Sequence, residues 1–341
     1  MGKIPYELME KYVYNRLGKN RDDVIVPSGP GIDVSITAIG ENSVLASHLD
    51  PIVGAVEKIG WLAVNVACND IATSGIRPKW IMSLILLPED WNADMLDRIT
   101  SDIDRAAREL DISIIGGHTG YAPGLSRPLV SITAMGTGNK DSVILTSMAK
   151  PGDSIIVSKG IALEGTAILA SDFEDILLSK GVSKKLIENA LEYFYSVSVV
   201  KEAVELTEAK LVNAMHDATR GGVAEALLEM AYASGTYIEV YEEKMPIKKE
   251  TVVFAEKLKF DPLWMISSGT LIIAVPAGKE DEVIKILKNM GISARVTGKV
   301  IKKSHPGVLI HRMDGSKKEL KNLEPDKDEL ARMWKEYPRV Y

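Results

Sequence analysis

The side chains best suited to chemistry in this sequence are carboxylates at the ends of expected strands and helices. Four aspartates stand out, and they lie far apart along the chain: Asp33, Asp50, Asp70 and Asp217. Hard oxygen ligands dispersed in this way suit Mg²⁺ that is also bound to phosphate oxygens. The five histidines show no paired metal spacing, and the sequence contains neither a Walker loop nor a Rossmann fingerprint. The residue types therefore favour a magnesium and phosphate site over a zinc site.

Asp217 lies in a stretch that combines a strand, a polar turn and a helix. A short buried strand is expected over 211–215, and apolar residues recur at helical spacing from Val223 onwards. Asp217 and Thr219 are both good candidates for the N-cap of that helix. A helix N-terminus presents backbone N–H groups to an anionic ligand, but a capped helix without a ligand explains the same pattern equally well.

Two glycines and an arginine occupy the turn itself. Gly221 and Gly222 lack a side chain, so another group can approach their backbone closely. Arg220 could steady the charge that develops in phosphoryl transfer, as could Lys3 if the N-terminal arm folds over the site. The alternative is an ordinary loop arginine.

Asp70 extends the apolar stripe of an expected helix over 54–74. Ile59, Ala63 and Val66 precede it at spacings that place all four residues on one helix face. An unpaired carboxylate on such a face is expensive, so Asp70 either has a neutralising partner or holds a cation. The alternative is an aspartate at the helix end that leans into solvent.

A second glycine-rich segment follows an expected strand over 112–115. Gly116 and Gly117 leave room for phosphate oxygens or sugar hydroxyls, and His118 and Thr119 come directly after them. Glycines and histidine also serve ordinary turns, so this expected loop is a weak signal by itself.

Composition restricts the class of protein. Hydrophobic residues make up 46% of the 341 residues and charged residues 26%, as in soluble globular proteins. The net charge of −6 gives no electrostatic footprint for nucleic acid or membrane. The single cysteine, Cys68, resembles a small core residue and cannot form an intramolecular disulfide. Without a secretory signal or an apolar run long enough to span a membrane, the protein is expected in the cytoplasm.

Strands and helices intermix along the chain without strict alternation, which predicts an α+β fold. The length allows two domains, and a polar stretch with a proline-glycine turn marks the seam between them. We expect a first domain over 1–146, a second over 147–325, and a helix and tail over 326–341.

Six short motifs in order make the chain resemble the superfamily of aminoimidazole ribonucleotide (AIR) synthetase, the PurM-like proteins. They are Gly2-Lys3-Ile4-Pro5, Asp50-Pro51-Ile52-Val53-Gly54, Asn69-Asp70-Ile71-Ala72, Gly116-Gly117-His118-Thr119, Asp217-Ala218-Thr219-Arg220-Gly221-Gly222-Val223 and Ser267-Ser268-Gly269-Thr270. The superfamily includes thiamine-monophosphate kinase, selenophosphate synthetase and the hydrogenase maturation protein HypE. The Asp-x-Thr-Arg-Gly-Gly turn and a late Pro-x-x-Asp-Glu-Leu look most like the HypE branch.

The resemblance implies two PurM-like domains and a homodimer that pairs through the sheets of the first domains. It also implies ATP as cofactor, with Mg²⁺ and phosphates on Asp33, Asp50 and Asp70. The segment from Gly116 to Thr119, Lys3, Gly221 and Gly222 would contact the nucleotide. Asp217 and Arg220 would act on the transferred phosphate. The implied activity is phosphorylation or activation of a carbonyl or amide oxygen, in hydrogenase or metallocentre maturation and with a maturation protein as partner.

Two features depart from the HypE pattern. The first strand reads Ile32-Asp33-Val34-Ser35, which lacks one acidic residue of the family pattern. HypE ends in a cysteine that carries the reacting group, whereas this sequence ends in Pro338-Arg339-Val340-Tyr341. We therefore expect no carbamoylation of this tail. A small-molecule kinase or ligase of the same fold, and a nucleotide-binding maturation partner without catalysis, stay open as alternatives.

Overall fold

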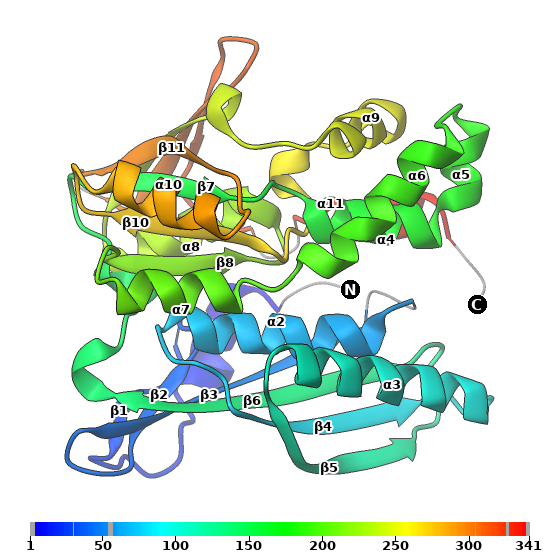
Figure 1. Cartoon of the computed structure of the whole chain (residues 1–341), viewed down its shortest axis with the longest axis horizontal. Coiled ribbons are helices and arrows are strands. Elements are labelled where there is room, and N and C mark those ends of the chain that lie inside the picture. Colours follow the sequence, from blue (N-terminus) through cyan, green and yellow to red (C-terminus); the bar gives the residue numbers. More distant parts are fainter. Residues whose placement is uncertain (1–3, 30, 54–56, 304, 325–326, 339–341) are drawn as a thin grey trace.

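The computed structural model describes residues 4–338 except residues 30, 54–56, 304 and 325–326. It contains two β-sheets, one above the other in Figure 1, with helices between and around them. Strands and helices from both halves of the chain contribute, so the predicted α+β class is confirmed. Residues 1–3, which include Lys3, and residues 339–341 lie outside the described residues.

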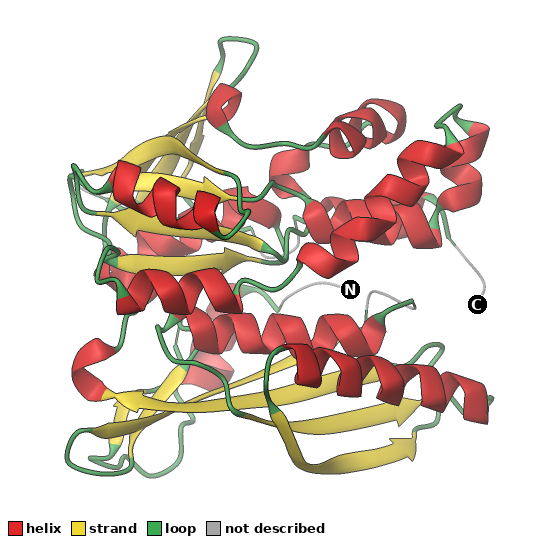
Figure 2. Ribbon diagram, in the orientation of Figure 1, coloured by secondary structure: helices red, strands yellow, loops and turns green. Residues whose placement is uncertain are grey.

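The first sheet has six strands in the order β1-β2-β3-β6-β4-β5. All neighbours are antiparallel except β4 and β5, which run parallel. The strands are β1 (Val24–Val26), β2 (Ser35–Ala38), β3 (Ser43–Ile52), β4 (Trp80–Leu87), β5 (Ser113–Tyr121) and β6 (Leu129–Asn139). Figure 2 shows that helices cover only one face of this sheet.

Two helices cover that face, and they differ in how they are buried. In α2 (Ile59–Thr73) every residue is buried, because the helix lies between the first sheet and the second domain (Figure 1). In α3 (Ala93–Glu109) only one stripe is buried, with Ile99 and Ile103 at its centre. Asn92 caps α3 by accepting a hydrogen bond from the Met95 backbone N–H at 2.8 Å.

The second sheet has seven strands in the order β13-β12-β9-β11-β7-β10-β8. Only β9 and β12 pair in parallel. The strands are β7 (Ser154–Ser158), β8 (Ala214–Ala218), β9 (Tyr237–Tyr241), β10 (Thr270–Val275), β11 (Ala294–Ile301), β12 (Gly307–His311) and β13 (Lys317–Leu320). Helices α7 (Val200–Glu208) and α10 (Glu280–Asn289) lie on one face and α8 (Gly222–Ser234) on the other (Figure 1), so the central strands are buried on both sides.

A helical layer extends from the side of the second sheet. It consists of α4 (Leu163–Asp172), α5 (Glu174–Ser179), α6 (Lys184–Leu191), α9 (Lys249–Leu258) and the late helix α11 (Glu329–Glu336). Trp334 fixes α11 to this layer by packing on Phe173, with 4.7 Å between the ring centroids. The remaining helical segments are α1 (Tyr6–Met9) and single turns at Glu10–Tyr14, Lys140–Ser142, Thr146–Met148, Glu192–Ser196, Glu242–Lys244 and Pro262–Trp264. The boundary at residues 146 and 147 stays a prediction.

The prediction of a loop at residues 116–120 is wrong. The residues from Gly116 to Gly120 continue the edge strand β5, which pairs with β4 along its whole length. A β-bulge at Ile115 lets the glycines follow β4, and Gly117 takes φ 154° with its Cα against the Ser83 backbone. Glycine-rich sequence indicated a turn here, but close packing against β4 is the reason for a glycine at position 117.

Candidate functional site

Asp217 lies near the end of β8 and is 1% exposed. Among the described residues, neither of its carboxylate oxygens has a hydrogen-bond partner. Burial raises the pKa of Asp217 to about 7; the His216 imidazolium opposes this shift, whereas the nearby Asp33 and Asp50 carboxylates add to it. A buried carboxylate in this state needs a proton or a cation beside it.

His216 precedes Asp217 and lies between two carboxylates. Its Nδ1 is 2.9 Å from an Asp33 carboxylate oxygen, and its Nε2 is 3.0 Å from a Glu229 carboxylate oxygen. Burial alone would lower the pKa of His216, but Asp33 and Glu229 outweigh it and hold that pKa well above its usual value. The imidazolium therefore joins β8 and α8 of the second domain to the start of β2 in the first.

Asp70 is 6% exposed and has a histidine partner. Its Oδ2 is 3.1 Å from His48 Nε2, and His48 Nδ1 makes a hydrogen bond to the Asp33 backbone carbonyl. The alternative of an aspartate leaning into solvent is therefore wrong. Asp50 follows His48 by two residues in β3, so both side chains project from the strand face that α2 covers. The Asp33 and Asp50 charges thus act on Asp217, and His48 links Asp70 to the Asp33 backbone.

The turn after Asp217 differs from the expected cap. Helix α8 begins at Gly222, and neither Asp217 nor Thr219 caps it. The Gly221 N–H instead donates to Asp328 Oδ2 at 2.9 Å, and Asp328 also caps α11 through the Leu330 N–H at 2.9 Å. One carboxylate from the late chain therefore occupies the position at a helix N-terminus where an anionic ligand can bind.

Gly221 and Gly222 have a steric reason to be glycines. Their φ angles are 81° and 66°, in the left-handed region that disfavours side chains. A Cβ on Gly222 would lie 2.6 Å from the backbone oxygens of Leu263 and Met265. The turn therefore packs closely against the Pro262–Trp264 segment, and the sequence did not indicate this packing.

A cavity of about 510 Å³ opens beside this turn, between the two domains and α11. Arg220 lies in its wall, and the guanidinium of Arg127 packs over the Trp334 ring at 4.8 Å. Glu164 also lines the cavity although it is only 1% exposed, and burial raises its pKa to about 7. The lining residues are Pro51, Ile52, Val53, Gly124, Leu125, Ser126, Arg127, Leu129, Glu164, Ile168, Arg220, Ile266, Asp328, Leu330, Ala331 and Trp334. The size suits a small molecule.

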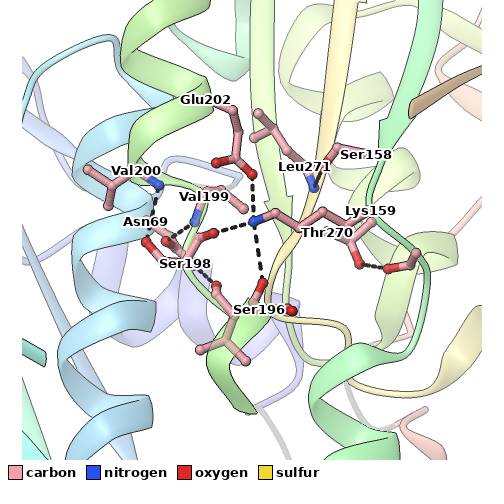
Figure 3. A network of polar contacts seen from close by, with 12 residues as sticks. Asn69, Ser158, Lys159, Ser196, Ser198, Val199, Val200, Glu202, Thr270 and Leu271 are labelled. Carbon is pink, nitrogen blue, oxygen red and sulfur yellow. Dashed lines mark hydrogen bonds and ion pairs between the residues drawn. The ribbon is translucent and has the colours of Figure 1, made fainter. Parts of the chain in front are cut away.

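A buried polar network holds the two domains together next to this site (Figure 3). Asn69 in α2 donates to the Val197 carbonyl at 2.8 Å and accepts from the Val199 N–H at 2.7 Å. Lys159 reaches the same segment from β7 and forms an ion pair with Glu202 at 2.6 Å. Because Asn69 directly precedes Asp70, this contact fixes the end of α2 relative to the second domain.

The segment from Gly116 to Thr119 lies elsewhere. Gly116, Gly117, His118 and Thr119 are exposed on the edge strand β5. His118 pairs with Leu84 of β4 and so shares the sheet face that no helix covers. The predicted role of this segment in nucleotide binding remains a prediction.

Three polar residues of the site were missed in the sequence. His48 could have been found, because strand alternation places it on the same face as Asp50. Glu164 lies in an apolar stretch that gave no signal beyond its own charge. Asp328 was expected only as part of a capped tail helix, since contact with Gly221 across 107 residues is a property of the fold.

No three His, Cys, Asp or Glu side chains of the described residues are already gathered as a complete metal site. Among the helices that the structure describes, none combines the length and apolar character needed to cross a membrane.

Comparison with known proteins defines the class. Residues 23–137 match the N-terminal domain of AIR synthase related proteins, and residues 150–311 match their C-terminal domain. The chain therefore belongs to the AIR synthase-related family. The resemblance that the six motifs indicated is confirmed.

Within this family, similar curated proteins include hydrogenase expression/formation proteins. A Methanocaldococcus jannaschii protein provisionally named for that role is 31% identical over 329 residues, or 92% of each chain. Carbamoyl dehydratase HypE of Azotobacter vinelandii is 27% identical and covers 89% of this chain and 86% of its own length. The expected likeness to the HypE branch is thus also confirmed.

Solved structures show the same fold. Hydrogenase maturation protein HypE in complex with ATP aligns with a TM-score of 0.71 and 23% identity, over 94% of this chain and 93% of the other. HypE in a HypE–HypF complex gives 0.70 and 21%, over 93% and 99%. Thiamine monophosphate kinase of Aquifex aeolicus gives 0.66 and 21%, over 91% and 97%. The two-domain PurM-like fold is therefore established.

Proposed function

We propose that this protein is an enzyme that uses Mg-ATP to phosphorylate or activate a carbonyl or amide oxygen of its substrate, in hydrogenase or metallocentre maturation. Asp217 carries the proposal, because both of its oxygens are buried and lack a hydrogen-bond partner among the described residues. A fold that retains such a carboxylate loses stability unless a cation or a reacting group compensates. The named activity of the HypE relatives supports the same class of chemistry.

Three of the four aspartates would hold a divalent cation. Asp33, Asp50 and Asp70 would hold Mg²⁺ from the first domain. The Asp33 and Asp50 carboxylates both raise the pKa of Asp217, which supports a site shared between the two domains. When bound, Mg²⁺ would neutralise phosphate oxygens and so assist transfer of the phosphoryl group. Asp217 would act on the transferred group from the second domain.

The turn and the cavity supply the remaining groups. Arg220 would contact phosphate oxygens from the cavity wall. Gly221 and Gly222 are further proposed contacts, and a phosphate would have to displace the Asp328 carboxylate from the Gly221 N–H to reach them. The cavity beside Arg220 would hold the acceptor, with Glu164 as a buried polar group against it. ATP in a similar HypE structure supports nucleotide binding by this protein. Lys3, His118 and Thr119 are further proposed nucleotide contacts, the last two from the exposed edge strand β5.

We also propose a homodimer that forms through the uncovered face of the first sheet. Large apolar side chains lie exposed there, with Leu49 at 62%, Met82 at 43% and Leu84 at 36%. An exposed apolar sheet face of this kind is typical of an interface, and a two-fold axis would bury the same patch on both subunits. His118 shares this face and would then lie at the interface.

The burial of Cys68 restricts where the reacting group of the substrate can be attached. It is fully buried in α2, and burial raises the pKa of its thiol. Such a thiol neither ionises readily nor reaches the cavity, so Cys68 does not carry a reacting carbamoyl group. The acceptor oxygen would belong to another molecule.

A small-molecule kinase is the second candidate. The cavity volume is within the range of small-ligand sites, and the thiamine monophosphate kinase structure shares the fold. A maturation protein would be the partner in the first case, as the HypE–HypF complex suggests for that relative. A nucleotide-binding partner without catalysis would bind ATP but not turn it over.

The test is Asp217→Asn, which keeps the shape of the side chain and removes its charge. We expect the affinity for a non-hydrolysable ATP analogue with Mg²⁺, measured by calorimetry, to stay within about threefold, while ATP turnover falls at least about 100-fold. Asp104→Asn, an exposed aspartate paired with Arg108 on α3, is the control and should retain both. Unchanged turnover in Asp217→Asn would remove this residue from the chemistry.

Asp70→Asn separates binding from turnover. This variant should weaken binding of the Mg²⁺–analogue complex by about tenfold or more, because one metal ligand loses its charge. Equal affinity in Asp70→Asn and the unsubstituted protein would place the cation elsewhere.

A further inference from the structure

His48 faces the Asp70 carboxylate, and its geometry differs from that of a simple surface ion pair. The imidazole is held from both sides. His48 Nδ1 bonds to the Asp33 backbone carbonyl, and Nε2 points to Asp70 Oδ2 at 3.1 Å.

The carbonyl contact determines which ring nitrogen carries a proton. A carbonyl oxygen only accepts, so His48 Nδ1 must be the N–H donor. In the neutral ring Nε2 then has a free lone pair, and this lone pair faces a carboxylate oxygen. Two acceptor atoms at this separation need a proton or a metal ion between them.

The distance fits two ligands of one metal ion. Ligand atoms about 2.1 Å from an octahedral ion, at right angles, are about 3 Å apart. The same orientation, in which one ring nitrogen donates to a backbone carbonyl and the other faces the site, is typical of metal-binding histidines. Asp50 extends from the same strand face as His48. Asp217 is buried and has no hydrogen-bond partner among the described residues, and the Asp33 and Asp50 charges act on it. A metal with phosphate ligands needs only one or two protein ligands in addition, so a complete protein cage is not required.

We propose that His48 is a direct ligand of the divalent cation held by Asp70, and that it gives this site a preference for ions that accept imidazole nitrogen, such as Co²⁺ or Zn²⁺, relative to Mg²⁺. The inference rests on the proposed function only in that it concerns the same aspartates. Oxygen-only sites suit Mg²⁺, whereas one imidazole shifts affinity toward the later first-row metals.

The first experiment measures metal preference with Co²⁺ alone and Mg²⁺ alone at fixed pH. Calorimetry should show that His48→Gln lowers Co²⁺ affinity by at least about tenfold and changes Mg²⁺ affinity by less than about threefold. His311→Gln is the matched control, since His311 also pairs with a carboxylate, Glu239 at 2.8 Å, but on β12 of the second domain. An unchanged ratio of Co²⁺ to Mg²⁺ affinity in His48→Gln overturns the proposal.

The second experiment does not depend on the variant folding. Proton NMR of the unsubstituted protein with one equivalent of Co²⁺ should show a hyperfine-shifted, exchangeable ring N–H signal from the coordinated imidazole. This signal should persist in His311→Gln and vanish in His48→Gln. A Co²⁺ complex without such a signal overturns the proposal, whatever the variant does.

The proposed function and the proposed role of His48 can be refuted independently of each other. A protein that binds Co²⁺ through His48 but neither binds nor turns over ATP would refute the proposed function and leave this inference standing. A protein that turns over Mg-ATP, with the same metal preference in His48→Gln as in the unsubstituted protein, would do the reverse.

Discussion

The two sheets of this protein are covered differently. The first sheet has helices on one face, and its other face exposes Met82 and Leu84. In the second sheet, β8 and β10 are buried along their whole length because helices lie on both faces. The first domain therefore has a surface suited to association, whereas the second domain supplies its polar residues from a closed interior.

This difference also separates the two halves of the site. His48 and Asp50 come from β3 and Asp33 from the segment before β2, and all three are partly accessible in the first domain. His216 and Asp217 come from a strand that is fully buried in the second. A charge in the second domain is thus more costly and more perturbed than one in the first. Substitutions in the two regions should therefore have different consequences.

The largest effect is expected on the uncovered face of the first sheet. Leu84→Asp should raise the dissociation constant of the proposed homodimer by about 100-fold to 10,000-fold. By symmetry each dimer loses two buried leucines, each worth about 1.5–3 kcal/mol. Sedimentation equilibrium gives the constant. Leu178→Asp, on an exposed position of α5 in the second domain, should not change it. A protein without substitutions that is already monomeric would contradict the proposed interface.

A smaller effect is expected from adding a methyl group at Gly222, in the closely packed turn of the second domain. Gly222→Ala should cost at least about 3 kcal/mol, because a positive φ adds to a clash with two backbone oxygens at 2.6 Å. Gly124 in the first domain has φ 81° but no atom within 4 Å of a Cβ, so Gly124→Ala should cost only about 1 kcal/mol. Urea denaturation measures both. Equal costs would mean that the turn is less closely packed than described.

The third-largest effect is expected from a substitution at the contact between the two domains. Asn69→Ala leaves a buried N–H and a buried C=O on residues 197–199 without partners, at a cost of about 2–3 kcal/mol. Asn65→Ala is the control, since its amide bonds to the Trp61 carbonyl of its own helix. Denaturation followed by probes in each domain should separate into two transitions only for Asn69→Ala. A single transition at the original midpoint would show that other contacts hold the domains together.

The smallest effect concerns Asp217 and pH. Folding raises its pKa from 3.8 to about 7, so between these values the folded state binds more protons than the unfolded state. Stability therefore falls as pH rises through this window. Asp217→Asn should melt close to the unsubstituted protein at pH 4 and at least about 3 °C above it at pH 8 without Mg²⁺. Differential scanning calorimetry tests this, and a lower melting temperature at pH 8 would show that Asp217 is already neutralised within the fold.

Part of the site could be predicted from local pattern. The helical spacing that put Asp70 on an apolar face correctly required a partner for it, and the structure supplies His48. The N-cap prediction for Asp217 and Thr219 failed because a distant carboxylate, Asp328, takes the N–H that a local cap would bind. The prediction of a loop at Gly116 was wrong for a related reason. Glycine permits a loop and a tightly packed strand equally, and only the neighbouring strand β4 distinguishes them.

The sequence by itself determined the residue types, the α+β class and the family, because periodicity and short motifs are local properties of the chain. It also determined that four aspartates were available for a cation. The tertiary structure alone decided which atoms face one another. Glu164, His48 and Asp328 join the site through contacts between segments that are far apart in sequence. The perturbed charge of Asp217 likewise depends on burial between two domains, and burial is set by the packing of the whole chain.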